Sequence, residues 1–176
     1  MRPLTLETAR WLTTGEAWQA LAVLAEREVS EHTLISVLAD LRLRHTEEQA
    51  AALLDQARLR EKGIEKFGAL ARRMLFVEEA LEQASGLTVA RYRAARYAAY
   101  GVVADLGCGI GGDALALGER CQSLLALDRD PVRLFLAEYN LHVARLRAER
   151  RFALADWTDY DFPPGVQAAF ADPSRR

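Results

Sequence analysis

The sequence predicts an α/β protein in which a bundle of short helices precedes the first half of a parallel β-sheet. Apolar residues recur at helical spacing, with few turn signals, from Leu4 to about Ala98. Four short apolar runs of strand length follow between residues 102 and 171, and helix-like segments separate the first three. Strands that alternate with helices form parallel sheets. We therefore expect a helical domain over residues 1–65 and a sheet domain over residues 66–176.

Candidate caps mark the starts of several helices in the first part of the chain. Thr13 and Glu16 have the spacing of a capping box, as do Thr46 and Gln49. A further helix is expected over Met74–Ser85, where apolar and polar residues alternate with helical periodicity. Each predicted helix has one apolar face, so we expect the helices to pack as a small bundle.

The sheet half begins with a buried strand at Val102, which leads through a cluster of glycines into a helix. Asp130 and Pro131 mark the start of the next helix, because Asp is a common N-cap residue and Pro is favoured at the first helical position. The remaining strands are expected at residues 123–127, 150–154 and 166–171.

The glycine cluster, Gly107-Cys108-Gly109-Ile110-Gly111-Gly112, indicates a ligand site. Glycine tolerates positive φ in a tight turn and, without a Cβ, lets the backbone approach a ligand closely. The helix that follows directs its free N–H groups and the positive end of its dipole into the same space. We therefore expect an anionic or carboxylate-bearing ligand to bind there.

Two classes of ligand fit this turn. The glycines satisfy the dinucleotide pattern G-x-G-x-x-G, and Asp128 follows about twenty residues later, where a ribose-binding carboxylate is expected. Asp105, two positions before the first glycine, distinguishes the two classes. A carboxylate there repels a diphosphate and attracts a cationic amino group, such as that of the methionine end of S-adenosylmethionine. The alternative is that Asp105 caps the turn.

The pattern Asp-x-Gly-x-Gly-x-Gly resembles the first motif of class I S-adenosylmethionine-dependent methyltransferases, which have a Rossmann-like sheet. The resemblance implies that Asp105 and the turn backbone hold the methionine portion, Asp128 the ribose, and Asp156 with Trp157 the adenine. For Asp156 a loop cap is the alternative. The predicted cofactor-binding residues are Asp105, Gly107, Cys108, Gly109, Gly111, Asp113, Asp128, Arg129, Asp156 and Trp157.

Asp172 and Pro173 follow the fourth predicted strand and resemble the catalytic motif of amino-group methyltransferases. The resemblance implies that they accept hydrogen bonds from the substrate amine and orient its lone pair. Ser174 and Arg175 depart from that motif, which has a second proline and a stacking aromatic residue. With residues 81–85 and the glycine turn, this ending resembles the bacterial THUMP-like methyltransferases and, more distantly, RNA-cap guanine-N2 methyltransferases. The implied acceptor is an amino group on RNA (tRNA or rRNA).

Composition and charge exclude several other classes of protein. The 176 residues have a net charge of −2, and no apolar run approaches the ~20 residues of a membrane span. Cys108 and Cys121 match neither a disulfide framework nor a metal site, and no signal peptide follows Met1, so we expect a cytoplasmic protein without metal.

The middle of the chain has an excess of basic residues, a basic band that either contacts phosphate or forms a solvated helix face. Its members are Arg58, Arg60, Lys62, Lys66, Arg72, Arg73, Arg91, Arg93 and Arg96.

Class I methyltransferase sheets have seven strands, whereas this sequence has signals for four. An apolar central strand would then form an open edge, so we expect a truncated sheet from a longer protein, or an edge covered by a partner chain. We expect the chain alone to bind the cofactor weakly and not to turn over. Two other functions compete with methyl transfer: an NAD-dependent oxidoreductase with the same turn, and a non-catalytic scaffold that binds a partner through its helices.

Overall fold

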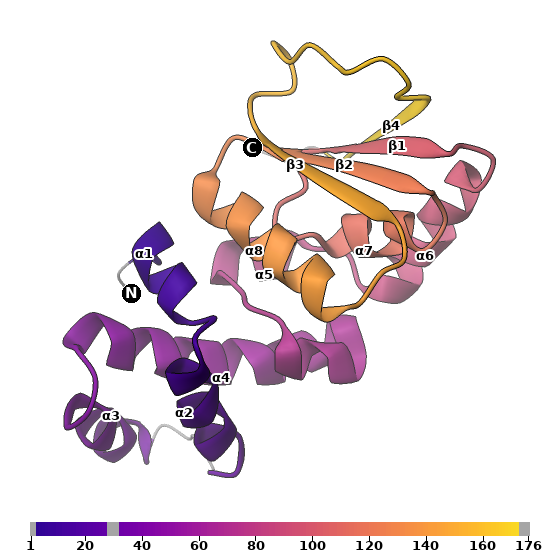
Figure 1. Ribbon diagram of the computed structural model, residues 1–176. Coiled ribbons are helices and arrows are strands. Elements are labelled where there is room, and N and C mark those ends of the chain that lie inside the picture. The colour runs from indigo at the N-terminus through magenta and orange to yellow at the C-terminus, as the bar shows by residue number, and fades with distance from the viewer. Residues whose placement is uncertain (1–2, 28–31, 173–176) are drawn as a thin grey trace.

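A computed structural model describes residues 3–27 and 32–172 and shows a helical half beside a sheet half (Figure 1). The helical half contains α1 (Leu6–Trp11), α2 (Gly15–Ala25), α3 (Leu34–Arg42) and α4 (Glu47–Phe67). The connection contains η1 (Gly68–Arg73), α5 (Glu78–Gln83), α6 (Leu87–Ala94) and η2 (Ala95–Tyr97), of which η1 and η2 are 3-10 helices. The sheet half contains β1 (Val102–Leu106), α7 (Gly112–Gly118), β2 (Ser123–Asp128), α8 (Pro131–Val143), β3 (Glu149–Leu154) and β4 (Ala168–Ala171). The predicted α/β fold is confirmed.

Side-chain hydrogen bonds select where the helices begin. The capping box of α4 is present, because the Thr46 hydroxyl oxygen accepts from the Gln49 amide at 3.2 Å and the Gln49 side chain accepts from the Thr46 amide at 3.1 Å. The prediction of a capping box at Thr13 is wrong. The Thr13 hydroxyl donates to a carbonyl in the last turn of α1 at 2.7 Å, and Thr14 caps α2 by accepting from the Ala17 amide at 3.4 Å.

The helix expected over Met74–Ser85 is wrong at its start, because the first four residues are extended and α5 begins after them. Two buried side-chain amides hold this extended segment. Gln56 of α4 exchanges two hydrogen bonds with the Phe76 backbone, at 2.7 and 2.9 Å. Asn140 of α8 exchanges two with the Leu75 backbone, at 2.8 and 3.0 Å. These amides satisfy backbone groups that helical hydrogen bonds would otherwise satisfy.

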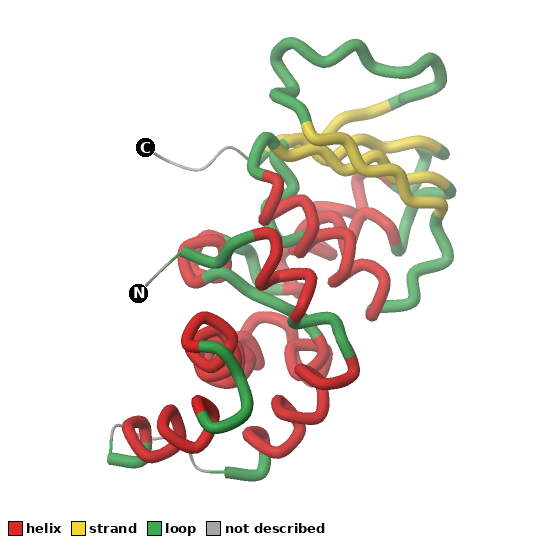
Figure 2. The backbone as a smooth tube through the Cα atoms, turned by 60° about the vertical axis from the view of Figure 1, so that its left-hand side comes forward, coloured by secondary structure: helices red, strands yellow, loops and turns green. Residues whose placement is uncertain are grey.

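The four strands form one parallel sheet in the order β3-β2-β1-β4. The register places Asp105 of β1 between Ala126 of β2 and Phe170 of β4. Helices α7 and α8 cover one face of the sheet, and the loop over residues 155–167 arches over the other face (Figures 1 and 2). A small apolar cluster lies on this second face: Ala104, Leu125 and Leu127, with Leu106, Ala153, Ala155, Tyr160 and Val166 packed against them.

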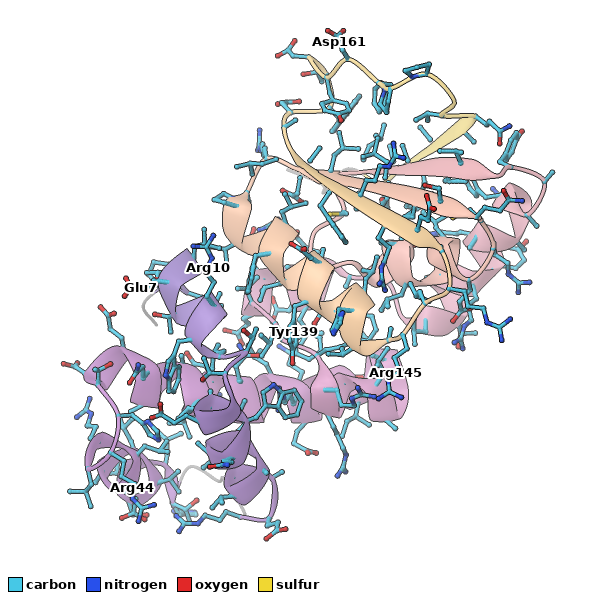
Figure 3. The ribbon with its side chains drawn as sticks, in the orientation of Figure 1. Glu7, Arg10, Arg44, Tyr139, Arg145 and Asp161 are labelled. Carbon is cyan, nitrogen blue, oxygen red and sulfur yellow. The ribbon has the colours of Figure 1, made fainter. Side chains whose placement is uncertain are left out.

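The helical half and the sheet half share one apolar core. A continuous cluster of buried side chains extends from Ala9 in α1 to Val143 in α8. Trp18 of α2 donates its indole N–H to the Tyr139 hydroxyl at 2.9 Å, and Figure 3 shows Tyr139 directed from α8 toward the helical half. The predicted domain boundary at residue 65 lies two residues before the end of α4, a helix that contacts α1, α2 and α3 as well as η1 and α5 of the connection.

Candidate functional site

The candidate site lies where the strand order of the sheet reverses. From β1 the chain passes outward to β2 and β3, and it then returns to the opposite side of β1 to form β4. In open parallel sheets, ligands bind in the crevice outside the carboxyl ends of the strands at such a reversal. Asp105 lies near the end of β1, the glycine turn follows it, and Asp172 follows β4 directly. The fold therefore brings three predicted parts of the site to one edge of the sheet.

The turn after β1 presents an open stretch of backbone. Gly107, Gly109 and Gly111 have φ angles of 75°, 57° and 86°, in the region that favours glycine. The amides of Gly107 and Cys108 both donate to the Leu127 carbonyl, at 2.9 and 2.8 Å, and thereby tie the turn to the end of β2. A Cβ atom at Gly107 or Gly109 would meet no heavy atom within 4 Å. The backbone at these two positions therefore faces space that a ligand can occupy.

Asp105 is the most unusual group of the site. The residue is 2% exposed, and the nearby Ala114 amide, in the first turn of α7, acts to lower the pKa of its carboxyl group. Its Oδ2 atom, however, is buried without a hydrogen-bond partner among the described residues. Burial and the nearby carboxyl groups of Asp113 and Asp128 raise the pKa of Asp105 to about 8. A buried polar atom without a partner is costly, and a hydrogen-bond donor from outside the chain would remove this cost.

Asp128 joins the glycine turn to the start of α8. Its side chain is buried, and its Oδ2 accepts from the Gly109 amide at 2.8 Å while its Oδ1 accepts from the Asp130 amide at 2.9 Å. Each carboxylate oxygen retains a further lone pair, so contact with ribose hydroxyls stays a prediction that this arrangement permits. Asp130 caps α8 as predicted, by accepting from the amides of Val132 and Arg133 at 2.8 and 3.1 Å.

Arg93 of α6 belongs to the site, although its position in the sequence indicated only a member of the basic band. Its Nη1 lies 2.7 Å from Asp172 Oδ2, 3.0 Å from the Ser85 hydroxyl and 3.5 Å from Asp113 Oδ1. Burial raises the pKa of Asp113, and the charge of Arg93 acts in the opposite direction. Arg93 therefore links the predicted catalytic carboxylate to the first turn of α7. No local pattern could reveal this link, because α6 and the end of β4 are far apart in the sequence.

The residues predicted to contact adenine lie on the loop after β3. Asp156 Oδ1 accepts from the amide and the hydroxyl of Thr158, at 3.0 and 2.7 Å, and these bonds hold the pKa of Asp156 below its ordinary value. In this structure Asp156 therefore has the role of a loop cap. Trp157 beside it is 40% exposed, and Arg129 is exposed after β2. Contacts from these three residues to a cofactor stay predictions.

The other predicted features of the site contribute no reactive group. Burial raises the pKa of the Cys108 thiol, which makes it a poor nucleophile, so Cys108 serves through its backbone amide. Pro173 lies outside the described residues.

The described part of the chain shows no group of three or more His, Cys, Asp or Glu side chains placed to hold a metal ion. None of the described helices combines the length and the apolar character that crossing a bilayer requires.

Several members of the basic band form ion pairs or hydrogen bonds with other elements of the chain. Lys62 pairs with Glu82 at 2.7 Å, and Arg91 pairs with Glu119 at 2.8 Å. The Lys66 ammonium group donates to three backbone carbonyls at the end of α5, at 2.7 to 2.8 Å. These residues bridge neighbouring elements, and the side chains of Lys62 and Arg91 stay about half exposed. The members of the band that stay exposed without an ion pair among the described residues are Arg58, Arg72, Arg73 and Arg96.

Two comparisons by sequence give relatives of different parts of the chain. Residues 5–63 match a family described as a domain of unknown function (DUF8688). Two Mycobacterium tuberculosis proteins, from strains CDC 1551 / Oshkosh and ATCC 25618 / H37Rv, are each described as an uncharacterised S-adenosylmethionine-dependent methyltransferase. Both are 37% identical to this chain over 107 residues, which is 58% of this chain. The chain spans 30% of the length of either relative.

A comparison with solved structures agrees with the fold. A crystal structure of a protein assigned as a methyltransferase, from Porphyromonas gingivalis W83, matches with a TM-score of 0.64 at 18% sequence identity. The match covers 88% of this chain and 36% of the other chain. At this identity the likeness concerns the fold alone, and it agrees with the parallel α/β sheet seen here.

Proposed function

We propose that this chain is the cofactor-binding part of an S-adenosylmethionine-dependent methyltransferase whose acceptor is an amino group on RNA. The observation that carries the proposal is the buried Oδ2 of Asp105, which has no partner among the described residues and lies beside an open glycine turn. The descriptions of the two M. tuberculosis relatives agree with it. Because the chain spans 30% of their length, the activity of the whole protein is part of the proposal.

The charge around Asp105 favours a cationic ligand over a dinucleotide. Four carboxyl groups gather there and interact, since three of them raise the pKa of the fourth, Asp105. A diphosphate would add negative charge to this cluster, whereas the ammonium and sulfonium groups of S-adenosylmethionine bring positive charge. The four residues are Asp105, Asp113, Asp128 and Asp172.

The residues present fit this cofactor. Asp105 would accept a hydrogen bond from the ammonium group of the methionine portion through its unpartnered Oδ2. The space beside Gly107 and Gly109 lets the backbone approach the ligand. Asp128 would accept hydrogen bonds from the ribose hydroxyls, and Asp156 with Trp157 would contact the adenine. When bound, the cofactor supplies a methyl group on a positively charged sulfur for transfer to a nucleophile.

Asp172 would hold the acceptor amine. Methyl transfer depends on alignment more than on acid–base chemistry, so a residue that orients a lone pair contributes directly. The Asp172 side chain is 52% exposed and is held by Arg93 at 2.7 Å, which leaves it acceptor capacity for an amine N–H. The exposed arginines of the basic band would contact RNA phosphates. Free thiols at Cys108 and Cys121 agree with the reducing cytoplasm that we propose as its location.

Calorimetric titration tests the choice of ligand. We expect the native chain to bind S-adenosylmethionine and not NAD, and Asp105→Asn to bind S-adenosylmethionine at least roughly tenfold more weakly, because the ammonium group loses a charged acceptor. Asp159→Asn removes an exposed carboxylate from the loop after β3 and serves as the control. NAD binding, together with unchanged S-adenosylmethionine affinity in Asp105→Asn, would favour the oxidoreductase and contradict the proposal.

Methyl transfer to RNA tests the acceptor. We expect the 176 residues alone to bind the cofactor weakly and to transfer no methyl group, and the longer protein that contains them to methylate RNA. In the longer protein, Asp172→Ala should abolish transfer and leave the affinity for S-adenosylmethionine unchanged, since the residue would orient the acceptor and not the donor. Full activity in Asp172→Ala would favour the non-catalytic role of this edge.

A further inference from the structure

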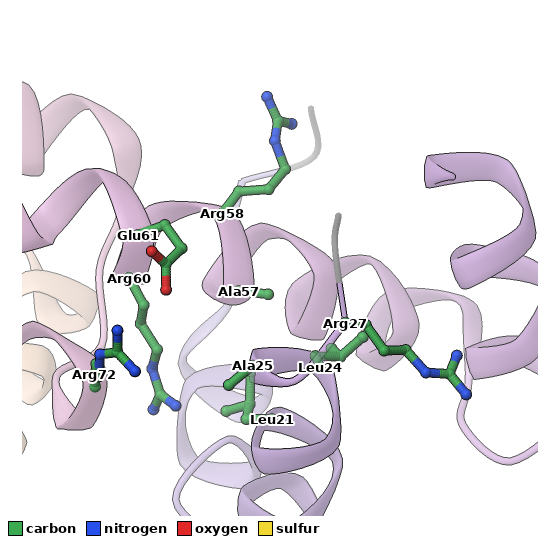
Figure 4. A pocket seen from close by; sticks show the side chains of 9 residues that line it. All are labelled: Leu21, Leu24, Ala25, Arg27, Ala57, Arg58, Arg60, Glu61 and Arg72. Atoms are coloured by element: carbon green, nitrogen blue, oxygen red, sulfur yellow. The ribbon is translucent and has the colours of Figure 1, made fainter. Parts of the chain in front are cut away.

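We propose that the helical half contains a site for a phosphate group, formed by Arg60 and Arg72 at a cavity between α2, α4 and η1. The cavity has a volume of about 120 Å³ and is shown in Figure 4. Four of the nine residues that line it are arginines and one is acidic. It lies in the half of the molecule away from the glycine turn, so the inference does not depend on the methyl donor (Figure 1).

Arg60 is buried and rigidly placed. The residue is 8% exposed, its Nε donates to the Met74 carbonyl at 3.0 Å, and its guanidinium group lies over the Trp18 ring, 4.7 Å from the centroid. Its Nη2 is buried and has no hydrogen-bond partner among the described residues. Leaving a buried charged donor unpaired is costly, and the charge of an anion in the cavity would offset part of this cost.

The charge of Arg60 is not neutralised by a carboxylate of the described chain. Burial lowers the pKa of Arg60 to about 10, and the nearby Tyr139 hydroxyl acts to raise that pKa. Figure 4 shows the Arg60 side chain extending toward Leu21 and Ala25 at the cavity. An anion at this point would therefore meet a cation that is already in place.

Arg72 supplies the second positive charge. It reaches the same cavity from η1, is exposed, and forms no ion pair with a described residue. The other two arginines are less available, because Arg27 pairs with Asp40 at 3.1 Å and Figure 4 shows Arg27 and Arg58 directed away from Leu21. Two guanidinium groups at one small cavity match the oxygen pattern of a phosphate group.

The size of the cavity limits the ligand to a single anionic group. Pockets for drug-sized ligands measure about 300–1,000 Å³, whereas this cavity measures about 120 Å³, the space of a few water molecules. A phosphate group fits this space and a complete nucleotide does not. The group can come from free phosphate or from one phosphodiester of an RNA strand, and the chemistry of recognition is the same.

Titration with inorganic phosphate, followed by NMR of the arginine Nε–H signals at constant ionic strength, tests the inference. We expect a saturable shift of the Arg60 signal, which Arg60→Lys identifies by its loss. Arg72→Gln should bind phosphate about tenfold more weakly, because one charge-assisted contact is removed. This residue is exposed, so the variant should fold normally. Arg10→Gln is the matched control, since Arg10 is an exposed arginine on α1 outside the cavity (Figure 3).

Competition distinguishes the two sources of the phosphate group. If a short single-stranded RNA displaces phosphate from the Arg60 signal, the site takes a phosphodiester of RNA. If RNA does not compete, the site takes free phosphate, and both results support an anion site. The inference is overturned if phosphate leaves the Arg60 signal unchanged, if chloride at equal ionic strength shifts it equally, or if Arg72→Gln responds like the native protein.

Discussion

Among single residues, Asp105 has the most unusual surroundings. Its carboxyl group is buried near the start of α7 and near three other carboxyl groups, and its Oδ2 has no hydrogen-bond partner among the described residues. The raised pKa means that the folded protein keeps a proton that the unfolded chain releases above about pH 4. Asp105 therefore makes the folded state less stable as the pH rises from about 4 to about 8. Such a cost is typical of a residue that is retained for binding.

The affinity for S-adenosylmethionine should rise with pH, by about tenfold per pH unit between roughly pH 5.5 and 7.0. The ammonium group of the ligand stabilises the ionised form of Asp105, so binding releases one proton below the pKa of about 8. Calorimetry in two buffers with different ionisation enthalpies measures the released proton. In Asp105→Asn the slope should disappear. An unchanged slope in that variant would assign the proton to another group.

Among the secondary-structure elements, α8 organises the site through Asn140. This residue is fully buried, and its amide group bonds to the Leu75 backbone in both directions and donates to the Ile110 carbonyl at 2.9 Å. One side chain therefore ties the extended segment before α5 to the glycine turn. The packing of the turn on α8 is equally close, since a Cβ atom at Gly111 would lie 2.6 Å from Leu141 Cδ1.

Asn140→Ala should lower the free energy of unfolding by about 2–4 kcal/mol, because it leaves three buried backbone groups without partners. Urea denaturation followed by circular dichroism measures the change. Gln19→Ala, on the exposed face of α2, is the control and should change stability by less than about 0.5 kcal/mol. A loss below about 1 kcal/mol for Asn140→Ala would show that these backbone groups find other partners.

The glycines of the turn should respond differently to substitution. Gly111→Ala should cost about 2–4 kcal/mol of stability, since a positive φ of 86° and the contact with Leu141 both oppose a side chain. Gly109→Ala meets no neighbour within 4 Å and should cost about 1–2 kcal/mol, from its φ of 57° alone. It should nevertheless weaken S-adenosylmethionine binding, as calorimetry would measure. Equal stability of the two variants would contradict the packing argument.

For the molecule as a whole, the shared core joins the predicted domains into one unit. The apolar cluster crosses the boundary at residue 65, and the hydrogen bond from Trp18 to Tyr139 adds a polar contact between the halves. The cavity at Arg60 and the cluster of carboxyl groups around Asp105 lie in different parts of this unit. The proposed phosphate site and the proposed cofactor site therefore lie on one framework that a continuous apolar core holds together.

Unfolding should therefore occur in a single cooperative transition. Trp157→Phe leaves Trp11 and Trp18 as the fluorescent reporters, so fluorescence then follows the helical half, while hydrogen exchange of the β1 and β2 amides follows the sheet half. Both measurements should give the same free energy of unfolding, because breaking the shared core exposes both halves. Two different values would show that residues 1–65 fold independently.

Local signals in the sequence account for most of the elements and for the composition of the turn. The apolar runs locate all four strands within two residues, the Thr46–Gln49 box starts α4, and Asp130 with Pro131 starts α8. These signals act between residues a few positions apart, so they can be recognised without the fold. The Asp-x-Gly-x-Gly-x-Gly pattern predicts the tight turn after β1 for the same reason.

Contacts between distant segments account for the rest. The segment before α5 is extended because amides from α4 and α8 satisfy its backbone, and helical periodicity contains no sign of them. Arg93 meets Asp172 across 79 positions of sequence. Asp105 is titratable near neutral pH because β2 and β4 flank it and remove water, and its residue type alone would leave it ionised. Desolvation and long-range pairing depend on the packed chain, which no short stretch of sequence contains.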